Sequence, residues 1–374
     1  MLIWWLNALA VLLLCIVFTG ILIPKILLIA FRKKLFDEPD ERKIHRGTVP
    51  RLGGIAFEPV ILFSIFFLFG MNLISGGSSF GNEIKANAPE LFMGICALII
   101  LYLVGMADDL IGIKYRAKFV VQIFCGILIV VSGIWIDNLQ GLFGIHEIPP
   151  VIGYPLTIFV IVFIVNSINL IDGIDGLASG LSAAATIVYG IFFMLVGKYI
   201  YALIAFATLG VLIPFFYFNV FGNQEQGHKI FMGDTGSLSI GILLSFLSIA
   251  LLQTYTADTP YNQFTPIILA FAPLIIPCFD VVRVIIHRFK EHRNLFKPDK
   301  NHIHHKLLYL GMSQRAAMPT IVFTSIVLTS ANVLLSPYLD VNILLVADIL
   351  FYTLINIWLT SQIKKRQTQT VKQN

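Results

Sequence analysis

Long uncharged stretches dominate the chain, and short polar segments separate them. A run of about 18 or more apolar residues is long enough to cross a bilayer as an α-helix. The stretch "YPLTIFVIVFIV", which ends just before Asn166, is one example without a single charge. The pattern predicts eleven membrane-spanning helices, at 1–31, 53–75, 89–107, 117–137, 153–171, 177–197, 199–221, 236–256, 264–287, 319–336 and 341–361.

The composition supports a membrane protein. Apolar residues make up 57% of the chain and charged residues only 13%, against about 25% charged in a typical soluble domain. The short alternating segments of a transmembrane β-barrel are not visible. We therefore predict an all-α, polytopic integral membrane bundle, with residues 1–374 forming one domain. The four cysteines are spread through apolar runs and are predicted to be free thiols.

Basic residues are distributed unevenly between the two predicted sides of the membrane. Of the 26 Lys and Arg residues, 23 fall in the predicted segments 32–52, 108–118, 222–235, 283–318 and 364–374. Cytoplasmic loops carry such an excess, so the N-terminus is expected outside and the C-terminus in the cytoplasm. The first stretch is expected to be a span rather than a cleaved signal peptide, because it is too long for one. The longest polar segment, about 289–318, is predicted to be a loop.

Polar motifs gather at the predicted cytoplasmic ends of the spans. They are "DEPDERKIHRGTVPRLGG", "GMADDLIGIKYRAKF", "NSINLIDGIDGLASG", "KIFMGDTGSLSIG" and "CFDVVRVIIHRFKEHRNLFKPDKNHIHHKLLYLG". A carboxylate deep in a bilayer costs about 2.5–3.5 kcal/mol. Structural polar residues have no reason to sort to one face, so the pattern indicates a single site that faces the cytoplasm.

Asp108 and Asp109 form a carboxylate pair at the end of the third predicted span. Adjacent carboxylates supply the oxygen ligands that Mg²⁺ prefers, together with substrate phosphates. The alternative is an ordinary interface turn whose acids pair with bases such as Lys118. The residues alone leave both interpretations open.

Two further motifs carry acids near span ends. Asn166, Asn169, Asp172 and Asp175 recur every third residue, which on a helix gives one slowly drifting face. In "GDTGS", Asp234 is expected to cap the N-terminus of the eighth span, a position that also suits an anion.

The stretch "HIHH" contains His302, His304 and His305. A zinc site is not favoured, because no HExxH motif and no cysteine accompany them. Clustered imidazoles and bases suit a diphosphate or a leaving phosphate, and a solvated basic loop is the alternative.

Acidic residues that bind a metal ion or act as a base, together with histidines and basic residues that neutralise phosphate charge, are typical of sites for phosphoryl transfer. A nucleotide-type donor would arrive from the cytoplasm, a lipid would be the acceptor, and no nucleic acid is expected. An ion-coupled transporter with a carboxylate relay is the alternative function, but its acids would lie near the midplane, usually in repeated halves. A CDP-alcohol phosphotransferase is disfavoured, because "DGIDGLAS" lacks the arginine of that family's core motif.

At these motifs the chain resembles the bacterial polyprenyl-phosphate N-acetylhexosamine-1-phosphate transferases. The matching stretches are "RKIHRGTVPRLGG", "GMADD", "NSINLIDGIDGLASG", "FMGDTGSLSIG" and "DKNHIHHKLLYLG", in the family's order. Ile303 interrupts the histidines, as in the WecA and TagO branch and unlike the more distant MraY branch. One departure is the segment "FNVFGNQEQGHKIFMGD", which separates Asn219 from Asp234 by more residues than is usual in the family.

The resemblance implies transfer of an N-acetylhexosamine 1-phosphate, favouring GlcNAc, from its UDP derivative to undecaprenyl phosphate, with release of UMP. It implies Mg²⁺ as cofactor, with Mn²⁺ as an alternative. It further implies a multi-pass enzyme of the bacterial cytoplasmic membrane with a cytoplasmic active site, at the first membrane step of cell-envelope polysaccharide synthesis. The oligomeric state stays open, a homodimer being one form. Direct displacement is favoured over a phospho-enzyme, because a phosphate oxygen is already nucleophilic near neutral pH.

The resemblance also implies residue roles. Metal-ligand roles fall on Asp108, Asp109, Asp172 and Asp234. Catalytic roles fall on Asp108, Asp109, Asp172, Asp175, His302, His304 and His305. Substrate-binding roles fall on Lys43, Arg46, Lys118, Asn169, Asn219 and Lys229.

Overall fold

The computed structural model describes residues 2–35, 49–76, 78–254, 264–292 and 301–373. Within these ranges the chain is helical and contains no β-strand. Ten helices among the described residues are long and apolar enough to cross a membrane. The predicted polytopic helical fold is therefore confirmed.

Each of the eleven predicted spans corresponds to a helical element. These elements are α1 (Leu2–Lys33), η1 (Gly53–Ala56) with α2 (Phe57–Ile74), α4 (Ala88–Ile111), α5 (Tyr115–Val131), α6 (Pro150–Ile171), α7 (Leu177–Leu195), α8 (Tyr199–Val220), α9 (Gly233–Leu252), α10 (Pro266–Phe271) with η3 (Ala272–Leu274) and α11 (Ile275–Lys290), α13 (Gln314–Leu335) and α14 (Val341–Gln373). The one outside the ten is α5, which has 17 residues. At 1.5 Å per residue, its length of about 26 Å falls a little short of the hydrocarbon thickness of about 30 Å.

Three short elements connect the spans: α3 (Ser78–Ala86), η2 (Leu142–Gly144) and α12 (Ile303–Tyr309). The prediction of a loop over 289–318 is wrong in part, because α12 lies within it and α13 begins at Gln314. Ile303 and Leu307 are four residues apart and both are buried, so one side of α12 packs onto the bundle. The mostly polar composition of residues 289–318 gave no sign of this short amphipathic helix.

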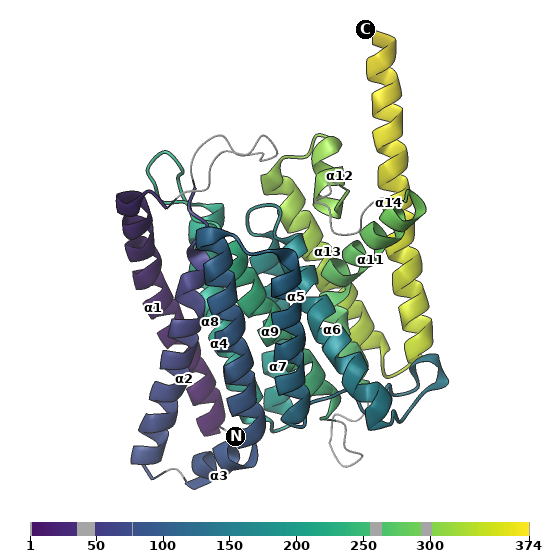
Figure 1. The fold of residues 1–374 in the computed structure, drawn as a ribbon. Helices are drawn as coiled ribbons and strands as arrows, with labels where there is room; N and C mark the ends of the chain where they lie inside the picture. Colours follow the sequence, from purple (N-terminus) through teal and green to yellow (C-terminus); the bar gives the residue numbers. More distant parts are fainter. Residues whose placement is uncertain (1, 36–48, 77, 255–263, 293–300, 374) are drawn as a thin grey trace.

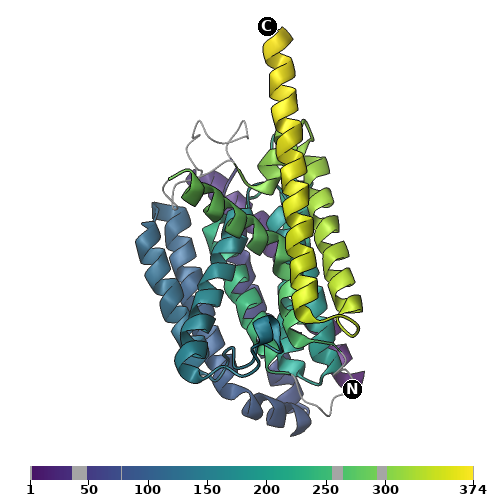
Figure 2. The same cartoon turned by 90° about the vertical axis from the view of Figure 1, so that its right-hand side faces the viewer.

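The two ends of the described chain lie at opposite ends of the bundle, and the last part of α14 extends beyond it (Figures 1 and 2). An odd number of crossings requires such an arrangement. Which end faces the cytoplasm stays a prediction.

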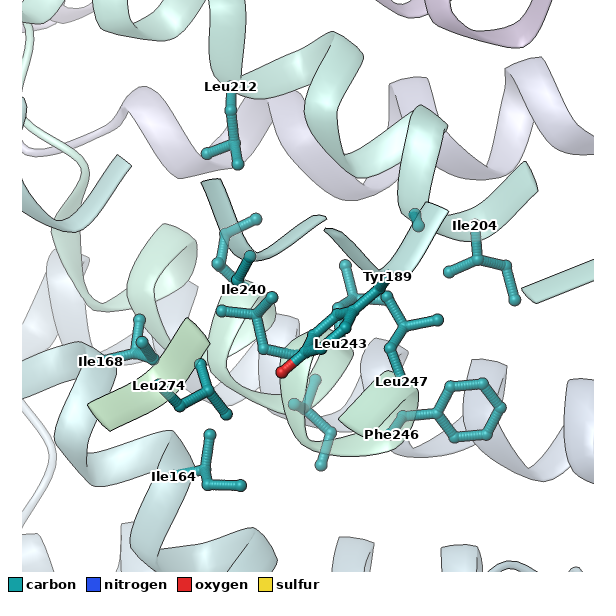
Figure 3. Packing of buried hydrophobic residues seen from close by; sticks show 14 of the residues in the cluster. Ile164, Ile168, Tyr189, Ile204, Leu212, Ile240, Leu243, Phe246, Leu247 and Leu274 are labelled. Carbon is teal, nitrogen blue, oxygen red and sulfur yellow. The ribbon is translucent and has the colours of Figure 1, made fainter. Parts of the chain in front are cut away.

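Helix α9 occupies the centre and packs against α4, α6, α7, α8 and α10. Almost every residue of α9 is buried, including its serines. Figure 3 shows the surrounding apolar cluster, in which Tyr189 lies among side chains such as Ile168, Leu212 and Leu243. The Tyr189 hydroxyl donates a hydrogen bond of 2.6 Å to the carbonyl of Ala270, so the one polar atom of this large side chain is satisfied.

Small residues allow α9 to approach its neighbours closely. A Cβ atom at Gly105 of α4 would lie 2.6 Å from the Cα atom of Thr235 in α9, a distance that only glycine permits. Gly241 has the same relation to α6, where a Cβ atom would lie 2.8 Å from the Cα atom of Val165. Membrane helices gain their packing energy from such close backbone contact. Because Gly105 lies one turn before Asp108 and Asp109, this contact brings the carboxylate pair to the first turn of α9.

Candidate active site

The predicted site residues lie at helix ends on one side of the bundle. Asp108 and Asp109 are in the last turn of α4, and Asp172 is the residue that follows α6. Asp234 is the second residue of α9, and Lys118 is in the first turn of α5. Three parts of the chain that are far apart in sequence thus contribute polar side chains to one place: the α4–α5 connection, the end of α6 and the start of α9.

Asp109 connects α4 to the start of α9 through hydrogen bonds. Its Oδ1 accepts a hydrogen bond from the backbone N–H of Asp234 at 2.8 Å. Its Oδ2 accepts one from the backbone N–H of Thr235 at 2.8 Å and another from the Thr235 hydroxyl at 2.5 Å. The first N–H groups of a helix have no partner inside the helix, so this carboxylate caps α9. The prediction that Asp234 caps α9 is wrong, because Asp109 reaches across from α4 to do so.

Lys118 joins two carboxylates from different helices. Its Nζ lies 3.0 Å from Asp108 Oδ2 and 2.6 Å from Asp234 Oδ2. The other oxygen of Asp234 accepts a hydrogen bond of 3.1 Å from Asn169 Nδ2, which also contacts the Ser237 hydroxyl at 2.8 Å. We call Asp108, Lys118, Asn169 and Asp234 the acidic centre. Three helix ends and the first turn of α5 position it, so its geometry depends on the whole bundle.

Asp172 lies beside the acidic centre. Burial raises the pKa of its carboxyl to about 7, and the nearby negative charge of Asp234 adds to the rise while Arg51 opposes it. The carboxylates of Asp234, Asp175 and Asp109 outnumber the Arg51 guanidinium among the charges that act on Asp172. A cation bound here would favour the ionised form of Asp172.

The predicted common helical face over 166–175 is correct only for its first part, because α6 ends at Ile171. Asn166 points to α5, where it donates a 2.7 Å hydrogen bond to Gln122 Oε1. Asp175 lies in the following turn and pairs with Lys229 at 2.6 Å. The turn after α6 thus separates Asp175 from the acidic centre.

The Asp175–Lys229 pair lines a cavity of about 1120 Å³. The wall also includes Asn223, Gln224 and Arg315, so polar side chains from three segments face it. This volume is slightly larger than the range of about 300–1,000 Å³ typical of small-molecule sites. The longer link that follows Asn219 forms part of this wall.

Asn219 is buried and fully engaged with the backbone. Its Oδ1 accepts a hydrogen bond of 2.6 Å from the N–H of Gly176, and its Nδ2 donates one of 2.8 Å to the carbonyl of Ile230. These bonds hold the turn carrying Asp175 against the segment carrying Lys229. The predicted role of Asn219 as a substrate contact remains a prediction, whereas its positioning contacts are observed.

The histidine motif meets the turn after α6. The ring of His304 packs on Gly173, where a Cβ atom would lie 2.6 Å from His304 Cε1. His304 is 1% exposed, and neither of its ring nitrogens has a hydrogen-bond partner within the described ranges. Burial lowers the pKa of His304 to about 3, so its imidazole is neutral. The ring centroids of His302 and His305 lie 5.8 Å and 4.2 Å from that of His304.

Asp280 was not predicted as a site residue, yet it holds the histidine motif. Its Oδ2 lies 2.7 Å from His302 Nδ1, and its Oδ1 accepts hydrogen bonds from Ile303 N–H at 3.1 Å, the Tyr352 hydroxyl at 2.9 Å and Arg283 at 2.9 Å. Its side chain is fully buried in α11. The only signal in the sequence is an aspartate inside the apolar run "IIPCFDVVRVII", upstream of the histidines.

Two predicted substrate-binding residues, Lys43 and Arg46, lie outside the described residues. The predicted metal-ligand roles also stay predictions. Among the residues described, no group of three or more His, Cys, Asp or Glu side chains is arranged to hold a metal ion. The donor chemistry nevertheless fits Mg²⁺: carboxylates of Asp108 and Asp234 already converge on one cationic atom, Lys118 Nζ.

Comparison with known proteins places the chain in a family. Residues 91–252, which include the acidic centre, match the family described as "Glycosyl transferase family 4". A Bacillus subtilis protein named "Probable undecaprenyl-phosphate N-acetylglucosaminyl 1-phosphate transferase" is 32% identical over 327 residues, covering 85% of this chain and 84% of the relative. The chain belongs to glycosyl transferase family 4.

Two other relatives carry a similar name. The "Undecaprenyl-phosphate alpha-N-acetylglucosaminyl 1-phosphate transferase" of Escherichia coli O157:H7 is 28% identical over 92% of this chain and 90% of its own length. That of Escherichia coli strain K12 is 29% identical over 82% of this chain and 78% of its own length. The family resemblance predicted from the motifs is confirmed.

Proposed function

We propose that this family member transfers N-acetylglucosamine 1-phosphate from UDP-N-acetylglucosamine to undecaprenyl phosphate and releases UMP. The observation that carries the proposal is the acidic centre, in which Lys118 joins carboxylates from α4 and α9 beside Asp172. Relatives that align over most of the chain are named for this reaction. Anionic phosphates, oxygen donors and a lipid acceptor are consistent with a charged site at the ends of apolar helices.

The chain's own residues orient and neutralise phosphate groups. Lys118 holds Asp108 and Asp234 in one place and offers its charge to an incoming phosphate. His304, neutral and without a hydrogen-bond partner among the described residues for either ring nitrogen, supplies a hydrogen-bond donor beside Gly173. Asp280 keeps His302 oriented through Nδ1. These groups are fixed before substrate arrives, which is how such sites lower barriers.

The bond changes follow from the substrates. An oxygen of the lipid phosphate attacks the β-phosphorus of the donor and forms a new P–O bond. The bond from that phosphorus to the oxygen shared with the α-phosphorus breaks, and UMP leaves with the electron pair. No side chain forms a covalent bond in this direct displacement.

Magnesium, when bound, supplies charge neutralisation for the diphosphate and for departing UMP. Asp108, Asp172 and Asp234 are the residues that would hold it. Asp109 is less suited to this task, because both of its oxygens already accept hydrogen bonds from the start of α9. We assign Asp109 a positioning role in the proposal.

The donor is proposed to bind in the cavity next to Asp175 and Lys229. This cavity is large enough for a nucleotide and is lined by amide and charged side chains. It adjoins the turn that also carries Asp172 and Gly173, so a donor in the cavity would extend its diphosphate toward the acidic centre and His304.

The active site is proposed to face the cytoplasm in the bacterial cytoplasmic membrane. The excess of Lys and Arg in the predicted cytoplasmic segments supports this orientation. The carboxylates also lie in the last turn of α4 and the first turn of α9 rather than mid-helix. Transporter sites lie near the midplane, so this placement disfavours an ion-coupled transporter.

The test is UMP release by purified protein supplied with UDP-N-acetylglucosamine, undecaprenyl phosphate and Mg²⁺. Asp108→Asn and Asp234→Asn are expected to lower turnover by at least about 100-fold, the range seen when one electrostatic group is lost. Asp348→Asn is the matched control: Asp348 is a buried carboxylate of α14 that accepts a 3.0 Å hydrogen bond from Asn332, away from the site. No UMP release by the wild type, or equal loss in the control, would contradict the proposal.

A further inference from the structure

A second large cavity lies away from the acidic centre. Its volume is about 1270 Å³, and it is lined by α11, α14, Asn301 and Lys306 of α12. Neither the carboxylates of the acidic centre nor Asp172 belong to its wall. A phosphate held here is therefore not placed to react with the groups of the proposed transfer.

The cavity is apolar along one part and basic at one end. The apolar part includes Phe279, Val282, Ile286, Ile349 and Ile357. The basic end includes Lys290, Lys306, Lys364 and Lys365, and Arg283 lies among the apolar residues of α11. On α14 the apolar residues precede the lysines, and on α11 Phe279, Val282 and Ile286 precede Lys290. Both helices run toward the end of the bundle that carries α12, so the basic end lies there (Figure 1).

The described lining residues of this cavity include no aspartate or glutamate. Arg283 of the wall pairs with Asp280 at 2.9 Å, so the excess of positive charge rests on the lysines. Lys306 donates to two neutral oxygens, Asn356 Oδ1 at 3.2 Å and Thr360 Oγ1 at 3.0 Å. Burial lowers the pKa of Lys306 to about 8, and the positive charge of Arg283 adds to this effect. An anion at this position would relieve the charge excess.

The apolar part is open to the surroundings of the bundle. Val282, Ile286, Ile349 and Ile357 are between 41% and 61% exposed, on helices that are long and apolar enough to cross a membrane. A free phosphate would use only the basic end, whereas an acyl chain would cover the apolar wall. The combination of a basic end and an exposed apolar wall is typical of sites for anionic lipids.

We propose that this cavity binds one anionic phospholipid, with its phosphate among Lys306, Lys364 and Lys365 and an acyl chain along α11 and α14. Arg283 and Tyr352 line the cavity and also contact Asp280, which orients His302. The lipid therefore lies directly behind the support of the histidine motif. This binding does not depend on the proposed transfer reaction.

The test is lipid binding by the purified full-length protein, measured as the number of lipids retained in native mass spectrometry. Dioleoylphosphatidylglycerol is the anionic probe, and dioleoylphosphatidylcholine, undecaprenyl phosphate and inorganic phosphate are the comparison arms. Removing a base near an anionic lipid weakens binding by about fivefold. Lys364→Gln with Lys365→Gln is thus expected to raise the dissociation constant for phosphatidylglycerol by at least tenfold.

Two further variants complete the design. Arg32→Gln with Lys33→Gln removes two adjacent exposed bases at the end of another spanning helix and is expected to leave binding unchanged. Ile349→Trp, at a position 45% exposed, fills the apolar part and is expected to displace the lipid while all the bases remain.

The proposal is overturned if phosphatidylcholine is retained as tightly as phosphatidylglycerol, or if the lysine variant and its control behave alike. It is also overturned if undecaprenyl phosphate or inorganic phosphate alone displaces the bound phospholipid. Because the readout is binding, loss of UMP release has no bearing on it, so a failure here is distinguishable from a failure of the proposed transfer.

Discussion

Asp109 offers the sharpest distinction between positioning and direct chemistry. Asp109→Asn keeps the shape of the side chain and replaces one oxygen by an amide group that donates. If the remaining side-chain oxygen faces Thr235, the new side-chain NH₂ group faces the backbone N–H of Asp234. Two hydrogen-bond donors then point at each other. One buried N–H is then left without an acceptor, which costs about 1–3 kcal/mol.

The expected decrease in the free energy of unfolding for Asp109→Asn is therefore about 1–3 kcal/mol. Thr235→Val removes only the hydroxyl that donates to Asp109 at 2.5 Å. The two changes share this bond, so a double-mutant cycle should give a coupling energy of about 1 kcal/mol.

The assay is unfolding of the purified protein in mixed micelles titrated with SDS, with UMP release measured on the same samples. The reasoning predicts that stability and turnover fall together in Asp109→Asn and that the cycle shows coupling to Thr235. Wild-type stability with no coupling, combined with lost turnover, would refute it. In that case Asp109 would act on substrate or metal rather than on the start of α9.

Three other predictions follow from the histidine motif. Gly173→Ala would push away the ring of His304 and lower turnover by about 100-fold. The control Gly70→Ala, whose new Cβ atom would have nothing within 4 Å, should have no effect on turnover. Similar losses of turnover in both variants would refute the contact between Gly173 and His304. Buried His304 stays neutral with a pKa of about 3, whereas an unfolded histidine gains a proton below about pH 6.5. The free energy of unfolding should therefore fall by about 1.6 kcal/mol between pH 6.5 and 5. His304→Gln should lose that part of the pH dependence, and unfolding curves of identical pH slope would contradict it. Asp280→Asn removes the oxygen that faces His302 at 2.7 Å, and it should lower the free energy of unfolding by about 1.5–3 kcal/mol and also lower kcat. A free energy of unfolding and a kcat equal to those of the wild type would show that His302 needs no such support.

Much of the fold was predictable because membrane helices are specified by local composition. Each predicted span has a helical counterpart, since a long apolar run in lipid must satisfy its backbone hydrogen bonds internally. The errors occur at the ends, where tertiary contacts decide. The helix α12 depends on burial of Ile303 and Leu307, and the cap of α9 comes from Asp109, 125 residues earlier in the chain.

The residue types of the candidate site were also visible in the motifs, but their partners were not. The spacing of Asp108 and Asp109 does not reveal that one faces Lys118 while the other caps α9. The sequence indicates only that Asn219 is a polar residue near a loop, whereas in the structure it is buried and hydrogen-bonded to two backbone segments. Asp280 was missed because a single acid in an apolar run gives no pattern. Such assignments depend on contacts between elements that sequence periodicity does not encode.

The central claim is that the acidic centre moves a sugar 1-phosphate, rather than the sugar alone, onto a lipid phosphate. The most direct measurement uses UDP-N-acetylglucosamine labelled with ³²P at the β-phosphorus and ¹⁴C in the sugar, with the wild type and Asp234→Asn compared. We predict that both labels enter the lipid fraction in equal amounts with wild type, that UMP is the nucleotide released, and that neither label moves with the variant. Recovery of ³²P in released UDP, or equal transfer by the Asp234 variant, would contradict the account.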